Sequence, residues 1–175
     1  MNKKIKNKIG ILGGTFDPAH VGHIKISKEA KKRFKLKKVF WAITKKNPFK
    51  NKSTLNLKKR MSYAKKINLK NKFIKVIFLE DKIKSNRTID LINYFKKKNK
   101  HKELYFIMGA DNLINFHKWN KWQKISSKCN ILVFDRNKYK TKSLKSVTYK
   151  KYNKQRLKFI TFKKVNISSS QLRKI

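Results

Sequence analysis

The chain has 175 residues, of which 39% are hydrophobic, and this length and composition suit one domain, residues 1–175, with a core of useful size. Lys and Arg number 50 against 8 Asp and Glu, a net charge of +42 that predicts attraction to polyanions. No run approaches the roughly 18 apolar residues that a membrane span requires, and a single cysteine, Cys129, excludes an internal disulfide.

The charge has two interpretations. A specific nucleic-acid binder is one, because phosphates attract basic side chains. However, most of the basic residues are Lys, spread along the whole chain, whereas Arg is the preferred reader of bases and phosphate forks. We therefore interpret most of the charge as solvated surface without a specific partner. The basic N-terminus lacks a cleavage-site pattern, so a cytoplasmic protein is expected.

The first half of the chain alternates short apolar runs with amphipathic stretches. In chain order, we expect a strand at 9–12, a helix at 22–34, a strand at 39–43, a loop at 47–53, a helix at 57–67 and a strand at 73–79. The first strand ends at a pair of glycines, which is typical of a turn into a helix.

The second half continues the alternation. The expected elements are a helix at 90–98 capped by Thr88, strands at 104–108, 131–134 and 159–162, and a capped helix from 168 onward. The polar stretch 136–155 is expected to be a loop or a helix-to-strand connection. Strands that alternate with helices predict an α/β fold, a Rossmann-like, doubly wound parallel sheet in a single domain.

The first chemical constellation follows the first strand, where residues 13–23 read GGTFDPAHVGH. Glycines allow a tight turn and close approach to a phosphate, and a helix N-terminus attracts anions. His20 and His23 are three residues apart, which places them on one helix face. Half of a metal site is the alternative, but no further Cys or His lies nearby to complete it, so no protein metal site is expected.

This stretch resembles the G-x-F-x-P-x-H-x-G-H signature of the nucleotidyltransferase superfamily. Residues 167–173, ISSSQLR, are similar to the I-S-S-T-x-I-R motif of the same superfamily, although a plain helix cap would also explain Ser168. The resemblance implies that both motifs close around the ATP triphosphate. The implied ATP-binding residues are Gly13, Gly14, Thr15, Phe16, His20, His23, Ser168, Ser169, Ser170 and Arg173.

A third segment, residues 106–122, reads FIMGADNLINFHKWNKW. It resembles the G-A-D-N-L-x-x-F-H-x-W-x-x-W stretch of bacterial nicotinate-nucleotide adenylyltransferases. Trp119 and Trp122 are expected on one side of a helix. We expect Trp119 to stack on a flat ring, whereas Trp122 could equally be part of the hydrophobic core. The resemblance implies acceptor-binding roles for Thr88, Gly109, Asp111 and Trp119.

The reaction implied is transfer of AMP from ATP to nicotinate mononucleotide, giving nicotinate adenine dinucleotide and pyrophosphate in NAD biosynthesis. The implied catalytic residues are His20, His23, Lys50 and Arg173, with Lys50 in a loop similar to the N-P-x-K loop of the family. Mg²⁺ would enter with ATP, held mainly by phosphates and water.

Three alternatives stay open at this point. The acceptor could be nicotinamide mononucleotide or phosphopantetheine, although the tryptophan segment argues against phosphopantetheine, which has no aromatic ring. From a different class, the chain could be a basic nucleic-acid-binding module, which would leave His20, His23 and Arg173 without a role. The partners expected are small-molecule substrates, with no specific nucleic acid and no membrane.

Overall fold

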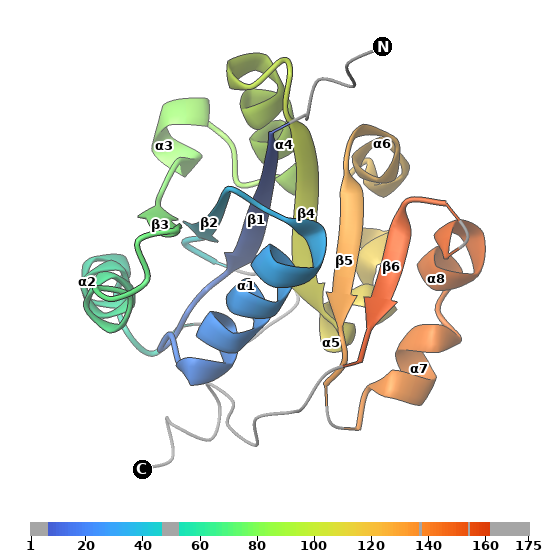
Figure 1. Cartoon of the computed structure of the whole chain (residues 1–175), viewed down its shortest axis with the longest axis horizontal. Coiled ribbons are helices and arrows are strands. Elements are labelled where there is room, and N and C mark those ends of the chain that lie inside the picture. Colours follow the sequence, from blue (N-terminus) through green and yellow to red (C-terminus); the bar gives the residue numbers. More distant parts are fainter. Residues whose placement is uncertain (1–6, 47–52, 137, 154, 162–175) are drawn as a thin grey trace.

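The computed structural model describes residues 7–46, 53–136, 138–153 and 155–161. Within them lies a six-stranded sheet in the order β3-β2-β1-β4-β5-β6, in which every neighbouring pair is parallel (Figure 1). This confirms the predicted Rossmann-like sheet. The strands are β1 (Lys8–Gly14), β2 (Lys38–Ile43), β3 (Ile74–Ile77), β4 (Glu103–Gly109), β5 (Asn130–Phe134) and β6 (Leu157–Ile160).

Helices cover both faces of the sheet, which explains why the strands are continuous apolar runs. Helices α1 and α2 pack on one face, where Leu12 and Trp41 are buried, and α4, α5, α6 and α8 pack on the other, where Ile11 and Phe106 are buried. The helices are α1 (Val21–Phe34), α2 (Leu57–Ile67), α3 (Glu80–Ile83), α4 (Thr88–Lys98), α5 (Ala110–Ile114), η1 (Phe116–Lys118), α6 (Trp122–Lys128), α7 (Lys140–Leu144) and α8 (Val147–Tyr152). Among the described residues, no helix combines the length and the apolar character needed to cross a membrane.

Several element predictions need correction. Thr88 is the first residue of α4 and does not cap it; Arg87 holds the cap position, without a side-chain cap bond. The stretch 136–155 forms neither a plain loop nor one connection, because α7 and α8 lie within it. Strand β6 begins two residues before the predicted position, at Leu157. The helix predicted from 168 onward lies outside the described residues.

The strand order places the candidate site. Chain order reverses between β1 and β4, which are neighbours, and such a switch point opens a crevice at the carboxyl ends of the strands. Strand β1 ends there at Gly14 and β4 at Gly109. In Figure 1 this is the lower edge of the sheet, toward which the arrowheads point. The predicted phosphate loop and the predicted acceptor segment therefore begin side by side.

Candidate functional site at the carboxyl edge of the sheet

The loop between β1 and α1 turns at Phe16, and not at the glycines as predicted. Phe16 has a φ of 50°, whereas no described glycine has a positive φ. Its buried ring stacks on Trp41 at 4.9 Å between centroids and contacts the His23 ring at 4.7 Å. A left-handed backbone is unfavourable for a side chain of this size, so this packing is what holds the turn.

The two histidines lie at the N-terminus of α1, as the sequence predicts. His20 is the N-cap residue, and its Nδ1 accepts the backbone N–H of Gly22 at 3.1 Å. The Nδ1 of His23 accepts the backbone N–H of His20 at 3.2 Å, and the ring centroids are 4.0 Å apart. A ring nitrogen that accepts a hydrogen bond carries no proton, so each neutral ring has its proton on Nε2. Both imidazoles are thereby fixed as Nε2–H donors.

His20 stays neutral over a wide pH range. Burial, and secondarily the positive charge of Arg136, lowers the pKa of His20 from 6.5 to about 4. At neutral pH the ring therefore donates one hydrogen bond and holds its cap bond with Gly22.

This shift predicts how His20 titrates and how folding stability depends on pH. We expect an NMR titration of the ring to give a midpoint near pH 4. Between pH 6.5 and about 4 the unfolded chain binds a proton that the folded chain does not, so the contribution of His20 to stability is complete above pH 6.5 and falls as pH falls. Arg136→Gln should raise the midpoint without restoring 6.5, since burial remains. A wild-type midpoint near 6.5 would contradict this assignment.

The segments that follow β4 and β5 contribute an ion pair between Asp111, in the first turn of α5, and Arg136. Nη1 of Arg136 donates to Oδ2 of Asp111 at 2.8 Å, and the Asp111 side chain is only 12% exposed. A Cβ built on Gly109 would lie 2.5 Å from Oδ1 of Asp111. The lack of a Cβ at Gly109 therefore gives room for the carboxylate of Asp111, a predicted acceptor-binding residue, to fold back over the end of β4.

The tryptophan segment differs from its predicted geometry. Trp119 has an extended backbone at the end of η1, and Lys121, with a φ of 52°, separates it from Trp122 at the start of α6. The two tryptophans are thus not on one helix. Both contact the Phe116 ring edge-on, at 5.1 Å for Trp119 and 6.4 Å for Trp122. Trp122 also contacts Tyr152, which supports its core role.

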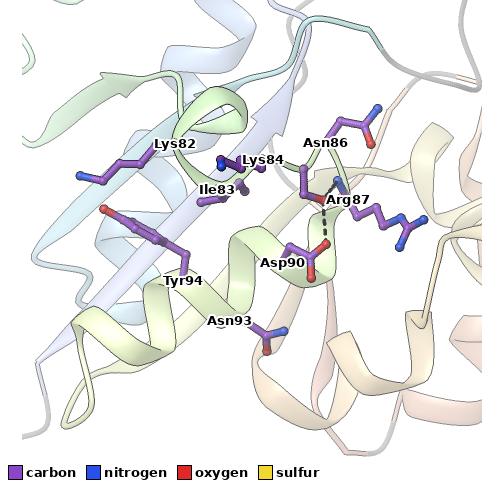
Figure 2. A pocket seen from close by; sticks show the side chains of 9 residues that line it. Lys82, Ile83, Lys84, Asn86, Arg87, Asp90, Asn93 and Tyr94 are labelled. Carbon is purple, nitrogen blue, oxygen red and sulfur yellow. Dashed lines mark hydrogen bonds between the residues drawn. The ribbon is translucent and has the colours of Figure 1, made fainter.

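A cavity of 670 Å³ lies beside Thr88, between α3 and the first turns of α4 (Figure 2). Ser85 Oγ donates to Asp90 at 2.7 Å across its floor. None of the predicted site residues lines it, so the cavity and the histidine pair are separate features. Its lining residues are Lys82, Ile83, Lys84, Ser85, Asn86, Arg87, Asp90, Asn93 and Tyr94.

Lys50, Ser168, Ser169, Ser170 and Arg173 lie outside the described residues. In the part of the chain that the structure does describe, no group of three or more His, Cys, Asp or Glu could hold a metal ion.

Sequence analysis missed two buried charged residues beside the phosphate loop, Asp17 and Arg60, each 2% exposed. Burial lowers the pKa of the Arg60 guanidinium, while Asp17 and Glu80 raise it. The signal for Arg60 was present in α2, where it falls on the same face as Leu57 and the buried Ala64. A charge on the apolar face of an amphipathic helix indicates a buried polar contact.

The chain is similar to known proteins in both sequence and fold. Residues 11–175 match the family model described as cytidylyltransferase-like. A Pelagibacter ubique protein named "Probable nicotinate-nucleotide adenylyltransferase" is 69% identical over 175 residues, which are 100% of this chain and 96% of that protein. A protein of the same name from Bradyrhizobium sp. is 40% identical over 130 residues, 74% of this chain and 67% of its own length.

A solved structure shares the fold. The nicotinic acid mononucleotide adenylyltransferase of Plasmodium falciparum, complexed with NaAD, superposes with a TM-score of 0.74 at 20% identity, covering 96% of this chain and 83% of that one. The family model spans most of the chain and the Pelagibacter relative spans all of it. The chain therefore belongs to the cytidylyltransferase-like family and, within it, to the nicotinate-nucleotide adenylyltransferases.

Proposed function

We propose that the protein transfers the adenylyl group of ATP to nicotinate mononucleotide, forming nicotinate adenine dinucleotide and releasing pyrophosphate. The observation that carries the proposal is the histidine pair at the N-terminus of α1, with both Nδ1 atoms occupied by backbone N–H groups. These bonds orient both imidazoles as Nε2–H donors at the switch point of a Rossmann-like sheet, where a triphosphate is bound in such folds. The names of the relatives support the same reaction.

The chemistry is a displacement at the α-phosphorus of ATP. An oxygen of the acceptor phosphate forms a bond to that phosphorus, and the bond from the phosphorus to the pyrophosphate oxygen breaks. The attacking oxygen is already anionic near neutral pH, because the second pKa of a phosphate monoester is about 6. No general base is needed, so the protein contributes positioning and electrostatic stabilisation.

On the ATP side, Nε2–H of His20 and of His23 would donate to phosphate oxygens, close to the backbone of residues 13–16. A neutral His20 suits this task, because it donates one hydrogen bond of fixed direction. Lys50 and Arg173 would neutralise the departing pyrophosphate, with the hydroxyl and N–H groups of Ser168–Ser170 as further donors. Mg²⁺ would enter as part of the ATP complex.

On the acceptor side, the ring of Trp119 would stack on the pyridine. Asp111 would hold ribose hydroxyls, next to the backbone at Gly109, and Thr88 would contact the acceptor from the start of α4. The Asp111–Arg136 ion pair supports this role because it holds the carboxylate at the end of β4 before a ligand arrives.

Pyrophosphate release tests the proposal directly. The protein is given ATP and Mg²⁺ with nicotinate mononucleotide, nicotinamide mononucleotide or phosphopantetheine in parallel reactions. We expect release with nicotinate mononucleotide to dominate. Pyrophosphate release mainly with another acceptor would support adenylyl transfer but refute nicotinate mononucleotide as the acceptor. No release with any of the three would refute adenylyl transfer.

We infer that the protein works in the cytoplasm on these small-molecule substrates, without a specific nucleic acid. Cys129 is buried, and burial raises its pKa to about 12, so the thiol is an inert part of the core. Measuring the binding of duplex DNA at increasing salt concentration tests whether the basic surface has a specific nucleic-acid partner. Binding that weakens steeply with salt and ignores sequence is expected from surface lysines alone.

A further inference from the structure

We propose that Arg60 is a positioning residue for adenylyl transfer, because its guanidinium joins the backbones of the loops that form the ATP side of the site. Among the described residues, the guanidinium donates to four backbone carbonyl oxygens, from Thr15, Thr44, Lys45 and Leu55. These carbonyls belong to the loop after β1, the loop after β2 and the segment before α2. Arg60 itself contacts no reacting atom in this assignment and acts through the loops.

The distances show how the guanidinium is shared. Nη1 lies 2.6 Å from the carbonyl oxygen of Thr15 and 2.8 Å from that of Thr44. Nη2 lies 3.2 Å from the oxygen of Lys45, and Nε lies 3.0 Å from that of Leu55. Carbonyl oxygens that converge on a buried point repel one another, so a cation with several donors is needed between them.

Carboxylates fix the same loops from their other sides. Asp17 accepts the backbone N–H of Thr54 at 2.6 Å and that of Leu55 at 3.0 Å. Glu80 accepts the hydroxyl of Thr44 and, at 3.2 Å, the backbone N–H of Lys45. In the loop after β2 and in the segment before α2, carbonyl groups accept from Arg60, while N–H or O–H groups donate to Glu80 or Asp17. The loop after β1 contributes the carbonyl of Thr15 to Arg60 and continues into Asp17 itself.

The network reaches the histidines through a short piece of backbone. Thr15, held by Arg60, precedes Phe16, whose left-handed backbone is maintained by packing, and the Phe16 ring contacts the His23 ring. Moving the Thr15 carbonyl would therefore shift Phe16 and disturb the imidazole pair. Misplacement of a catalytic group by about 1 Å can cost about a hundredfold in rate.

Arg60→Lys is the informative change, because an ammonium keeps the charge but has three donors without the planar fork. The matched control is Arg156→Lys. Arg156 also donates to a backbone carbonyl, that of Ser127, but at the opposite edge, where its own carbonyl binds the N–H of Ile131 at the start of β5. We expect Arg60→Lys to lower kcat about tenfold, as a partial misplacement should, and Arg156→Lys to leave kcat unchanged.

A second readout uses the ligand-free protein. Nitrogen-15 shifts of the His20 and His23 rings should identify Nδ1 as unprotonated and Nε2 as protonated in the wild type. In Arg60→Lys the two nitrogen shifts of each ring should move toward each other, as expected when both tautomers of the imidazole are populated. In Arg156→Lys they should not move. The kinetic readout rests on the proposed function, but the ring-nitrogen readout does not. A wild type without turnover would therefore refute the function and still leave the positioning role to be decided by NMR.

The proposal is overturned if folded Arg60→Lys retains wild-type kcat and unchanged ring-nitrogen shifts. Thermal unfolding of both variants checks folding. If Arg60→Lys does not fold, Arg60→Gln is measured in the same way. Failure of both to fold would also overturn the proposal, because Arg60 would then maintain the whole fold instead of positioning these loops.

Discussion

Replacing His20 with alanine is expected to lower kcat at least about a hundredfold, the scale seen when one preorganised donor to a transition state is removed. The Nε2–H of His20 is fixed in direction because Nδ1 accepts the N–H of Gly22. Alanine removes that donor and the helix cap together. Pyrophosphate release at saturating ATP and nicotinate mononucleotide measures the loss.

Two further variants separate these effects. His20→Asn keeps a side-chain oxygen that can cap α1 but lacks an Nε2–H, so it should recover about 1 kcal/mol of stability relative to alanine without recovering turnover. His101→Ala removes an exposed histidine in the turn between α4 and β4, and should behave as the wild type. Near-normal turnover in His20→Ala would refute the role of His20.

Replacing Trp119 with alanine is expected to raise KM for nicotinate mononucleotide by tens of fold. Stacking of a base on an aromatic ring is worth about 1–3 kcal/mol by alanine substitution, and a pyridine offers a similar face. KM for ATP should change much less, because none of the proposed ATP contacts lies in the Trp119 segment. Initial rates at varied acceptor and fixed saturating ATP provide the measurement.

Trp122→Ala is the matched control, since it removes the same ring three residues away. Trp122 contacts Phe116 and Tyr152, and we assign it to the core. This variant should lower the unfolding temperature with little change in KM for the acceptor. Equal KM increases in both variants would argue that Trp119, too, serves packing alone.

Local patterns in the sequence predict most of the fold. The helix prediction 57–67 agrees with α2 at both ends, because its apolar positions recur at helical spacing and Asn56 supplies a cap. The start of β6 was predicted less well, because pairing with β5 begins at Leu157, two residues before the apolar run at 159–162. Pairing with β5 decides that boundary, and pairing is a tertiary property.

The short helices show a similar limit. Helices α3, α5, α7 and α8 have four to six residues each, too few for a hydrophobic period to be recognised. Such helices are not stable alone, so packing against neighbouring elements determines whether they form. The same applies to Trp119 and Trp122, whose spacing suggested one helix but whose backbone is broken at Lys121.

By itself, the sequence determined the parallel α/β order and the proximity of His20 and His23, because each depends on local periodicity or on short spacing. The adjacency of β1 and β4, which pairs Lys8 with Glu103, was decided by the tertiary structure. Only the tertiary structure decided the hydrogen-bond state of those rings, the Asp111–Arg136 ion pair and the convergence of loop carbonyls on Arg60. The Asp111–Arg136 pair and three of the four carbonyl contacts of Arg60 join residues between 15 and 45 positions apart. The histidine bonds span only two or three residues, but they depend on the backbone conformation at the start of α1. Neither the partners of a charge nor its desolvation can be derived from neighbours along the chain.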